Sequence, residues 1–134
     1  MKLIYNDFNE ATNETIITIA DRYGRYTGKA KLHPDDTNNY IVGGTIAEAR
    51  AKINFYKSRI RREKIRLQTL ISLKNEFNFS PEGITFLNQK IEMHKKNIKD
   101  FETAIEYQEQ YIKDYIKRKS ELSKKIKERM DKNK

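Results

Sequence analysis

The residues best able to do chemistry in this chain are cationic, and they gather in two short stretches. RIRREKIR, residues 59–66, carries five positive charges in eight positions, and HKKNIKDF, residues 94–101, adds three lysines. Guanidinium groups bind phosphates and carboxylates through paired hydrogen bonds. Three interpretations stay open: a solvated helix face, a surface for an acidic protein, and a grip on a nucleic-acid backbone. The candidate partner-binding residues are Arg59, Arg61, Arg62, Lys64, Arg66, Lys95, Lys96, Lys99 and the aromatic Tyr107 and Tyr111.

Aromatic and apolar side chains suggest further contact surfaces. Tyr107, Tyr111 and Tyr115 follow one another at intervals of four residues, which forms a ladder along a helix. Tyrosine is enriched among interface hot spots, so the ladder either packs on the N-terminal sheet or binds a partner, and a homodimer would use the same surface. Phe55 and Ile65 lie off the expected helix seam, which predicts an apolar flank that the hairpin does not cover.

Catalytic and metal-binding patterns are weak. GRYTGKA, residues 24–30, has some likeness to a phosphate-binding loop, but its glycines are one residue too close and Ala30 replaces the required hydroxyl. The HPDD turn, residues 33–36, offers an imidazole and two carboxylates to a metal, although this composition is more typical of turn chemistry. His94 is expected to be a polar residue in a helical seam. We therefore expect no enzyme activity, no cofactor and no bound metal.

Composition indicates one helix-rich domain with an uneven charge. Of 134 residues, 35% are charged and 37% hydrophobic. Residues 1–44 carry five basic and six acidic side chains, whereas residues 45–134 carry 23 and 13, so the positive field belongs to the second part. We expect neither a membrane span nor a signal peptide, because no apolar run reaches about 18 residues. The absence of cysteine fits a reducing compartment, so the expected location is cytoplasmic.

The N-terminal third of the chain has the pattern of a small sheet. Residues 14–22 and 25–32 are β-branched or alternating, and residues 2–8 form a candidate third strand. Tyr23 and Gly24 offer a tight turn in which glycine takes positive φ. A sheet of this size buries too little apolar area to be stable alone, so it should lie against a helix.

Two heptad patterns follow the sheet. Thr45 and Glu48 form a capping box, which predicts a first helix over about residues 45–77. Ser80, followed by proline, predicts a second helix over about residues 81–131. Isoleucine and leucine recur every seven residues in both segments, which is the seam of a coiled coil.

The loop between these segments is about three residues long, so the helices should fold back as an antiparallel hairpin. Facing positions then sum to about 160, which leaves the second helix beyond about Lys113 without a helical partner. We expect that part to meet the sheet or a second subunit. The sheet should therefore dock there.

The same register places residues 59–66 opposite residues 94–101, basic against basic. The acidic stretch 100–109 instead compensates the proximal half of the first helix, where the basic residues are Arg50, Lys52 and Lys57. Uncompensated positive charge therefore collects in the distal half of the hairpin, which is the strongest functional signal of the pattern.

The expected fold is α+β, with a small N-terminal antiparallel β-sheet of three strands packed on a long two-helix antiparallel coiled-coil hairpin. Residues 1–44 form the sheet segment and residues 45–134 form the helical hairpin, and the two make one structural unit. Such a hairpin has no deep pocket by itself, which favours binding over catalysis.

The stretches GKAKLHPDD and GGTIAEARA resemble a group of small proteins encoded by phages and mobile elements of low-GC Gram-positive bacteria. The shared pattern is Gly-x-Ala-Lys, a Pro-x-Asp turn, then Gly and a helix with Ala and Arg-Ala, over about residues 26–51. Residues 37–42 depart from the more acidic and aromatic linker of that pattern, and the second helix lies outside it. The matching residues are Gly28, Ala30, Lys31, Pro34, Asp36, Gly43, Ala47, Arg50 and Ala51.

The resemblance implies a non-catalytic accessory protein that acts in a host bacterial cell. Proteins of this kind include anti-CRISPR inhibitors, so the expected function is evasion of host defence by binding a Cas nuclease, with Cas9 as the expected partner. The basic and aromatic coiled-coil surface would contact an acidic patch of the nuclease or its guide RNA. The alternative is direct DNA or RNA binding, and the third reading is a structural oligomerisation module.

Overall fold

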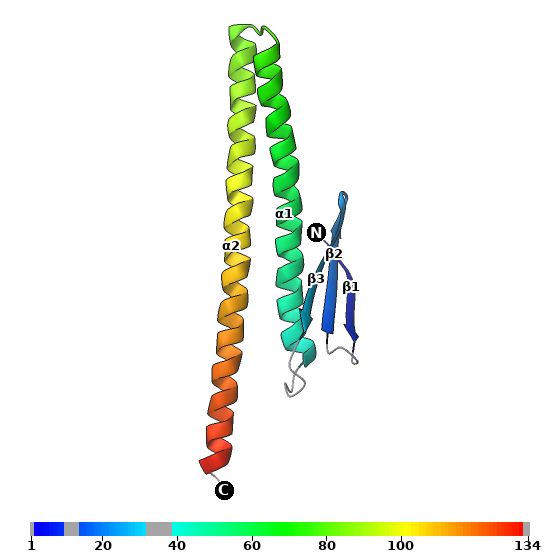
Figure 1. Ribbon diagram of the computed structural model, residues 1–134, viewed down its shortest axis with the longest axis vertical. Coiled ribbons are helices and arrows are strands. Elements are labelled where there is room, and N and C mark those ends of the chain that lie inside the picture. The colour runs from blue at the N-terminus through cyan, green and yellow to red at the C-terminus, as the bar shows by residue number, and fades with distance from the viewer. Residues whose placement is uncertain (1, 10–13, 32–38, 133–134) are drawn as a thin grey trace.

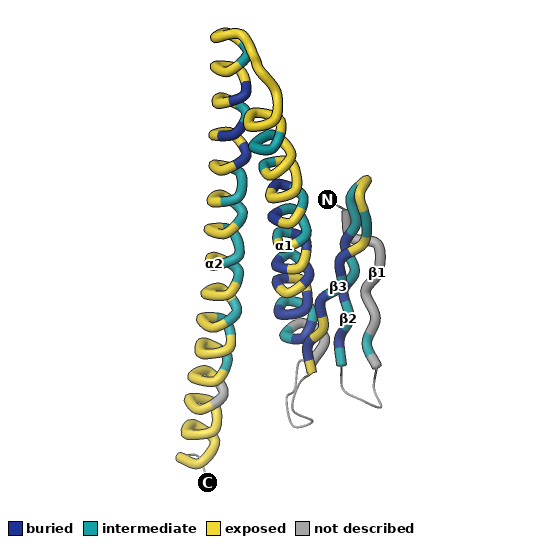
Figure 2. Tube along the Cα trace, turned by 45° about the horizontal axis from the view of Figure 1, so that its top comes forward, coloured by how far each residue is buried: buried dark blue, intermediate teal, exposed yellow. Residues whose placement is uncertain are grey.

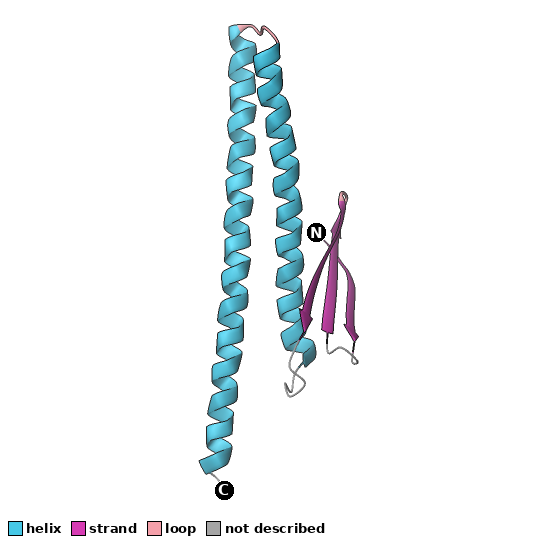
Figure 3. Cartoon of the chain, in the orientation of Figure 1, coloured by secondary structure: helices cyan, strands magenta, loops and turns pink. Residues whose placement is uncertain are grey.

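The computed structural model describes residues 2–9, 14–31 and 39–132. The elements are β1 (Lys2–Asn9), β2 (Glu14–Asp21), β3 (Gly24–Lys31), α1 (Asn39–Glu76) and α2 (Pro81–Lys132). A small antiparallel sheet lies beside a long helical hairpin, and α1 lies between the sheet and α2 (Figure 1). Strands and helices occupy separate parts of the chain (Figure 3), so the predicted α+β class is confirmed.

Strand β2 is the centre of the sheet and pairs antiparallel with β1 and with β3. Its side chains alternate, with Thr15, Ile17 and Ile19 buried, and Tyr26 and Ala30 are buried on β3. These five residues share one face of the sheet, because successive side chains of a strand point to opposite faces. The bounds of β2 and β3 lie within one residue of the predicted segments.

The turn between β2 and β3 differs from the predicted one. Arg22 and Tyr23 form the turn, while Gly24 pairs with Asp21 as a strand residue and its φ lies outside the left-handed region. The Asp21 carboxylate accepts backbone N–H groups of Tyr23 at 2.8 Å and of Gly24 at 3.1 Å. The predicted Tyr23-Gly24 turn with positive φ is therefore wrong, because the aspartate closes the turn.

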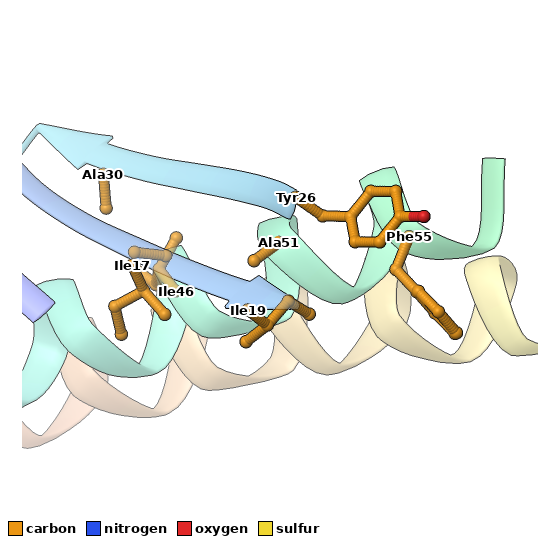
Figure 4. Packing of buried hydrophobic residues seen from close by; sticks show 8 residues of the cluster. Ile17, Ile19, Tyr26, Ala30, Ile46, Ala51 and Phe55 are labelled. Carbon is orange, nitrogen blue, oxygen red and sulfur yellow. The ribbon is translucent and has the colours of Figure 1, made fainter. Parts of the chain in front are cut away.

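The core lies between the sheet and α1, where Ile17, Ile19 and Tyr26 meet Ala51 and Phe55 (Figure 4). The rings of Tyr26 and Phe55 meet edge to face, with centroids 5.3 Å apart. Phe55 thus lies off the helical seam, as predicted, and the sheet buries it, so this residue is not an exposed contact surface. One face of α1 supplies most of the apolar contact that the sheet needs.

Small residues allow β3 to approach α1 closely. A Cβ atom on Gly28 would lie 1.9 Å from the carbonyl oxygen of Ala47 and 2.3 Å from the backbone nitrogen of Ala51. Any side chain at this position would collide with the helix backbone. The glycine and the two alanines are thus explained by packing.

Side chains of α1 also donate hydrogen bonds to backbone carbonyl groups of β3, which is an edge strand. Arg50 Nη1 donates to the carbonyl oxygen of Lys29 at 2.6 Å, and Asn54 Nδ2 donates to that of Thr27 at 2.7 Å. Such bonds discourage pairing of the edge with another chain. Of the residues that carry the phage-protein resemblance, Pro34 and Asp36 lie outside the described residues, as does the rest of the HPDD turn.

Helix α1 begins at Asn39, six residues before the predicted start. Thr45 lies inside the helix, so its predicted role as N-cap is wrong. Gly43 and Gly44 are helical, although a glycine costs a helix interior about 1 kcal/mol relative to alanine. Val42 packs against the core cluster, and this tertiary contact outweighs the local preference.

The hairpin follows the predicted register. Ser80 caps α2, because its Oγ accepts the backbone N–H of Gly83 at 3.1 Å. The rings of Tyr56 on α1 and Phe101 on α2 lie 6.0 Å apart between centroids, as facing positions that sum to about 160 require. No helix among the described residues has an apolar stretch that could cross a bilayer.

The predicted docking of the sheet on α2 beyond Lys113 is wrong. The sheet lies on α1, and α2 reaches the core through Ile112 and Tyr115, which are partly buried (Figure 1). The small side chains of Ala47 and Ala51 let Gly28 of β3 approach the backbone of α1 closely, which fits the sheet to this helix.

Candidate functional site

The basic segment 59–66 is divided among different faces of α1, because successive residues turn by about 100° around a helix. Arg59 and Arg62 are half-buried and face the tip of the β2–β3 hairpin, whereas Arg61 and Lys64 are exposed. The segment therefore contains two groups with different environments.

The first group surrounds Tyr23, and we call Arg22, Tyr23, Arg59 and Arg62 the Tyr23 cluster. Guanidinium carbons of the three arginines lie 4.8, 5.1 and 4.0 Å from the centre of the tyrosine ring, in that order. Arg62 also donates to the Tyr23 carbonyl at 3.2 Å, and Arg22 donates to its hydroxyl at 2.7 Å. The Arg22 bond is the main cause that lowers the pKa of Tyr23, and the nearby Arg66 adds to it.

Asp21 supplies negative charge beside this cluster. Loss of hydration acts to raise the pKa of Asp21, but the two backbone hydrogen bonds of the turn act against it. The positive charges of Arg59 and Arg62 add to the hydrogen bonds, so the pKa of this carboxyl falls below its ordinary value of 3.8. Within the described part of the chain, Arg59 Nε and Arg62 Nη1 are buried without a hydrogen-bond partner. Arg59 and Arg62 thus connect α1 to the hairpin tip through the ring of Tyr23 and the charge of Asp21.

A buried polar layer interrupts the coiled-coil seam next to the Tyr23 cluster, because Glu63 directly follows Arg62 on α1. Glu63 and His94 are both buried and hydrogen-bond to each other through Oε2 and Nδ1. Asn97 Nδ2 lies 3.5 Å from the same oxygen, and Arg66 Nη1 lies 3.8 Å from the other carboxylate oxygen. His94 is thus a seam residue, as predicted. Its hydrogen bond with Glu63 explains why both facing seam positions are polar.

A groove lies between β3, α1 and α2, and exposed cations of both helices share its side of the hairpin. The groove has a volume of about 600 Å³ and is lined by Lys29, Arg50, Lys57 and Lys113, together with Glu109 and an apolar floor of Ile53 and Ile112. Positions seven residues apart lie on the same side of a coiled-coil helix. Lys64 therefore shares the side of Lys57, and Lys99 lies two heptads before Lys113.

The same heptad argument places Arg61 with Asn54 and Lys95 with Glu109, both of which line the groove. We call Arg61, Lys64, Lys95 and Lys99 the basic flank. All four are exposed, and Lys95 lies 3.5 Å from Glu92 on its own helix. The structure thus brings these four predicted residues together on one side of the hairpin.

Tyr107 and Tyr111 lie on the other side of the hairpin. They line a second depression with Glu48 and Lys52, which form an ion pair at 3.6 Å. Tyr111 stacks on Tyr115 with centroids 6.2 Å apart, and Tyr107 is 67% exposed. The predicted basic and aromatic residues therefore do not form one continuous surface, and Lys96 is an exposed position of α2.

Two interactions within the chain were not anticipated from sequence: the contacts of Tyr23 with arginines and the hydrogen bond of Arg50 to β3. Tyr23 is the centre of the arginine cluster, although the only available signal was the mixed composition of RYGRY at residues 22–26. Arg50 was expected to compensate the acidic stretch of α2, and it lines a groove with Glu109, but its guanidinium donates to β3. Comparisons with family models, curated proteins and solved structures gave no match.

Proposed function

We propose that the protein is a non-catalytic binding protein that docks the basic flank of its hairpin on an acidic surface of a partner protein. The observation that carries the proposal is the clustering of Arg61, Lys64, Lys95 and Lys99 in exposed positions on one side. Arg59 and Arg62 contact Tyr23 at the tip of the β2–β3 hairpin and so are not part of the flank. An exposed array of cations favours association with an acidic surface and speeds its encounter.

The partner that the phage-protein resemblance suggests is a Cas nuclease, with Cas9 as the first candidate. Binding of the basic flank to an acidic patch of such an enzyme would inhibit it stoichiometrically, without catalysis. The support is the charge of the flank together with the resemblance over about residues 26–51. Lys57 and Lys113 extend the positive charge along the groove.

A Cas9 complex with guide RNA tests this proposal. We expect co-elution with the protein in size-exclusion chromatography and blocked DNA cleavage at a molar ratio near one. The variant R61E/K64E should weaken binding about 100-fold, because each reversed pair removes roughly 1–2 kcal/mol. The matched control is K117E/K125E, which makes the same change of charge on exposed residues outside the flank. Equal binding by both variants would refute a role for the flank.

Direct nucleic-acid binding is a second candidate, favoured by the same exposed cations. It predicts retention of free DNA or RNA whose affinity falls steeply with salt, with a log–log slope near the number of phosphates neutralised. The ring of Tyr23 is covered by guanidinium groups, so it is a poor platform for base stacking. A gel-shift titration at two salt concentrations distinguishes this candidate from nuclease binding.

A further inference from the structure

The sheet covers only part of the outer face of α1. The tip of the β2–β3 hairpin ends part-way along the helix, and none of the three described strands lies beside the distal part of α1 (Figure 1). The turn residue Tyr23 meets Arg59 and Arg62, which marks where this cover stops. Figure 2 shows the change from a buried to an exposed surface along α1.

The uncovered face continues the sheet-binding face of the helix. Steps of three and four residues lead from Ala51 and Phe55, beneath the sheet, through Arg62 to Ile65 and Thr69, so these residues lie on one side of α1. Ile65 is 67% exposed, whereas Phe55 is 8% exposed. The difference arises from the end of the sheet, since both residues point to the same side.

This distal face carries little charge in a chain in which 35% of residues are charged, and Glu76 is the one charged residue among the described residues that line its depression. Residues 67–73, LQTLISL, carry no charge. A shallow depression of about 410 Å³ lies along the face. We call its uncharged lining residues the distal strip: Ile65, Gln68, Thr69, Ser72 and Leu73.

The strip has basic residues around its proximal part and the acidic Glu76 at its distal end. By helical position Lys64 lies on one side of it and Arg66 on the other, and Arg61, seven residues before Gln68, lies at its proximal end. Depletion of charge at the centre and polar groups at the rim is the anatomy of a protein–protein interface. A nucleic-acid site would instead carry its positive charge across the whole contact.

We infer that the distal strip is the centre of a protein-docking surface, and that its occupant is an amphipathic helix of a partner with an apolar face and acidic flanks. This inference rests on the proposed function and names the chemistry of its partner. Charge complementarity with Arg61, Lys64 and Arg66 selects acidic flanks. A second copy of the chain is disfavoured as occupant, because the two sets of basic residues would face each other.

The strip and the basic flank form one surface. Arg61 and Lys64 belong to the basic flank and border the strip, so the partner contacts apolar side chains at the centre and cations beside them. The distance from Ile65 to Leu73 is about 12 Å along the helix axis, which matches two turns of a docked helix. The apolar centre would contribute binding free energy, and the cations would orient the docked helix.

The probe is a fluorescein-labelled three-heptad peptide with leucine on one helical face and glutamate on both flanks. Fluorescence anisotropy measures its binding to the full chain. The comparison peptide has the same composition in scrambled order. We expect the ordered peptide to bind at least 10-fold more tightly than the scrambled one. Equal affinity of the two peptides, or no binding of either, would overturn the inference.

Variants of the chain locate the contact. I65S/L73S should weaken binding of the ordered peptide about 10-fold or more, as truncation at an interface centre does. The matched control is L122S/I126S, which makes the same apolar-to-polar change at exposed positions of α2. Circular dichroism checks that both variants keep their helix. Equal losses in the two variants would place the peptide elsewhere.

The nuclease experiment separates failure of this inference from failure of the proposed function. If R61E/K64E weakens nuclease binding and I65S/L73S leaves it unchanged, the basic flank is retained and the strip is excluded. If the ordered peptide binds the strip and no nuclease complex forms, the inference stands and the proposed partner fails. Sedimentation that shows concentration-dependent dimers abolished by I65S/L73S would assign the strip to a second copy and overturn the inference.

Discussion

Replacement of Gly28 by alanine should separate the sheet from α1. The added Cβ would lie 1.9 Å from the Ala47 carbonyl oxygen, whereas ordinary contacts begin near 3.4 Å. The strand would therefore have to retreat by about 1.5 Å. A gap of about 1 Å already removes up to half of the attraction between packed atoms.

The loss is large because β3 meets α1 through backbone and small side chains. We expect G28A to lower the free energy of unfolding by about 3 kcal/mol, as overpacking of a rigid contact does. For 134 residues this corresponds to a fall in Tm of about 10 °C. Urea unfolding followed by circular dichroism measures the change. Ala47 and Ala51 cannot relieve the clash, since the colliding atoms belong to the backbone.

The matched control is G24A on the same strand. Its Cβ would lie 3.7 Å from the Tyr26 hydroxyl oxygen, which is an ordinary contact, and the φ of Gly24 needs no glycine. Both substitutions restrict the unfolded chain equally, so that contribution cancels in the comparison. G24A should change the free energy of unfolding by less than about 0.5 kcal/mol. Unfolding free energies of the two variants within that margin would refute the packing argument.

Three further predictions concern the same region. Y23L should lower the midpoint of urea unfolding, since cation–π contacts with Arg62 and its neighbours are lost. Because the pKa of Asp21 is lowered in the folded state, its contribution to stability is present above pH 3.8 and is lost as the pH falls through the folded value. D21N should therefore flatten the acid limb of a stability–pH curve, and an unchanged limb would contradict this. E63L should cost about 1–3 kcal/mol by leaving the buried imidazole of His94 without its partner, whereas E63L/H94L should recover most of the loss in a double-mutant cycle.

Local sequence signals predicted the structure correctly where interactions between residues close in the chain determine the conformation. Ser80 caps α2 as its position before proline predicts, and the heptad seam sets the register that brings Tyr56 to Phe101. Thr45 is a counterexample, because its capping box was overridden. Burial of Val42 against the sheet extends α1 backwards through two glycines.

The candidate site could be predicted only in part. The count and spacing of cations indicated a binding surface, and Arg61, Lys64, Lys95 and Lys99 do lie exposed on one side. The same count included Arg59 and Arg62, whose side chains turn toward Tyr23. Which arginines remain exposed depends on where the hairpin tip ends, and a one-dimensional pattern does not contain that information.

Periodicity and composition alone determined the class of the fold, the two long helices and the excess of positive charge, because each arises from contacts between residues close in the chain or repeated along it. Tertiary structure decided which helix receives the sheet. The atoms responsible are a glycine on β3 and two alanines on α1, whose close approach joins segments about 20 residues apart. From that contact follow the covered Phe55 and the uncovered Ile65, since the length of the sheet determines where the protected face of α1 stops.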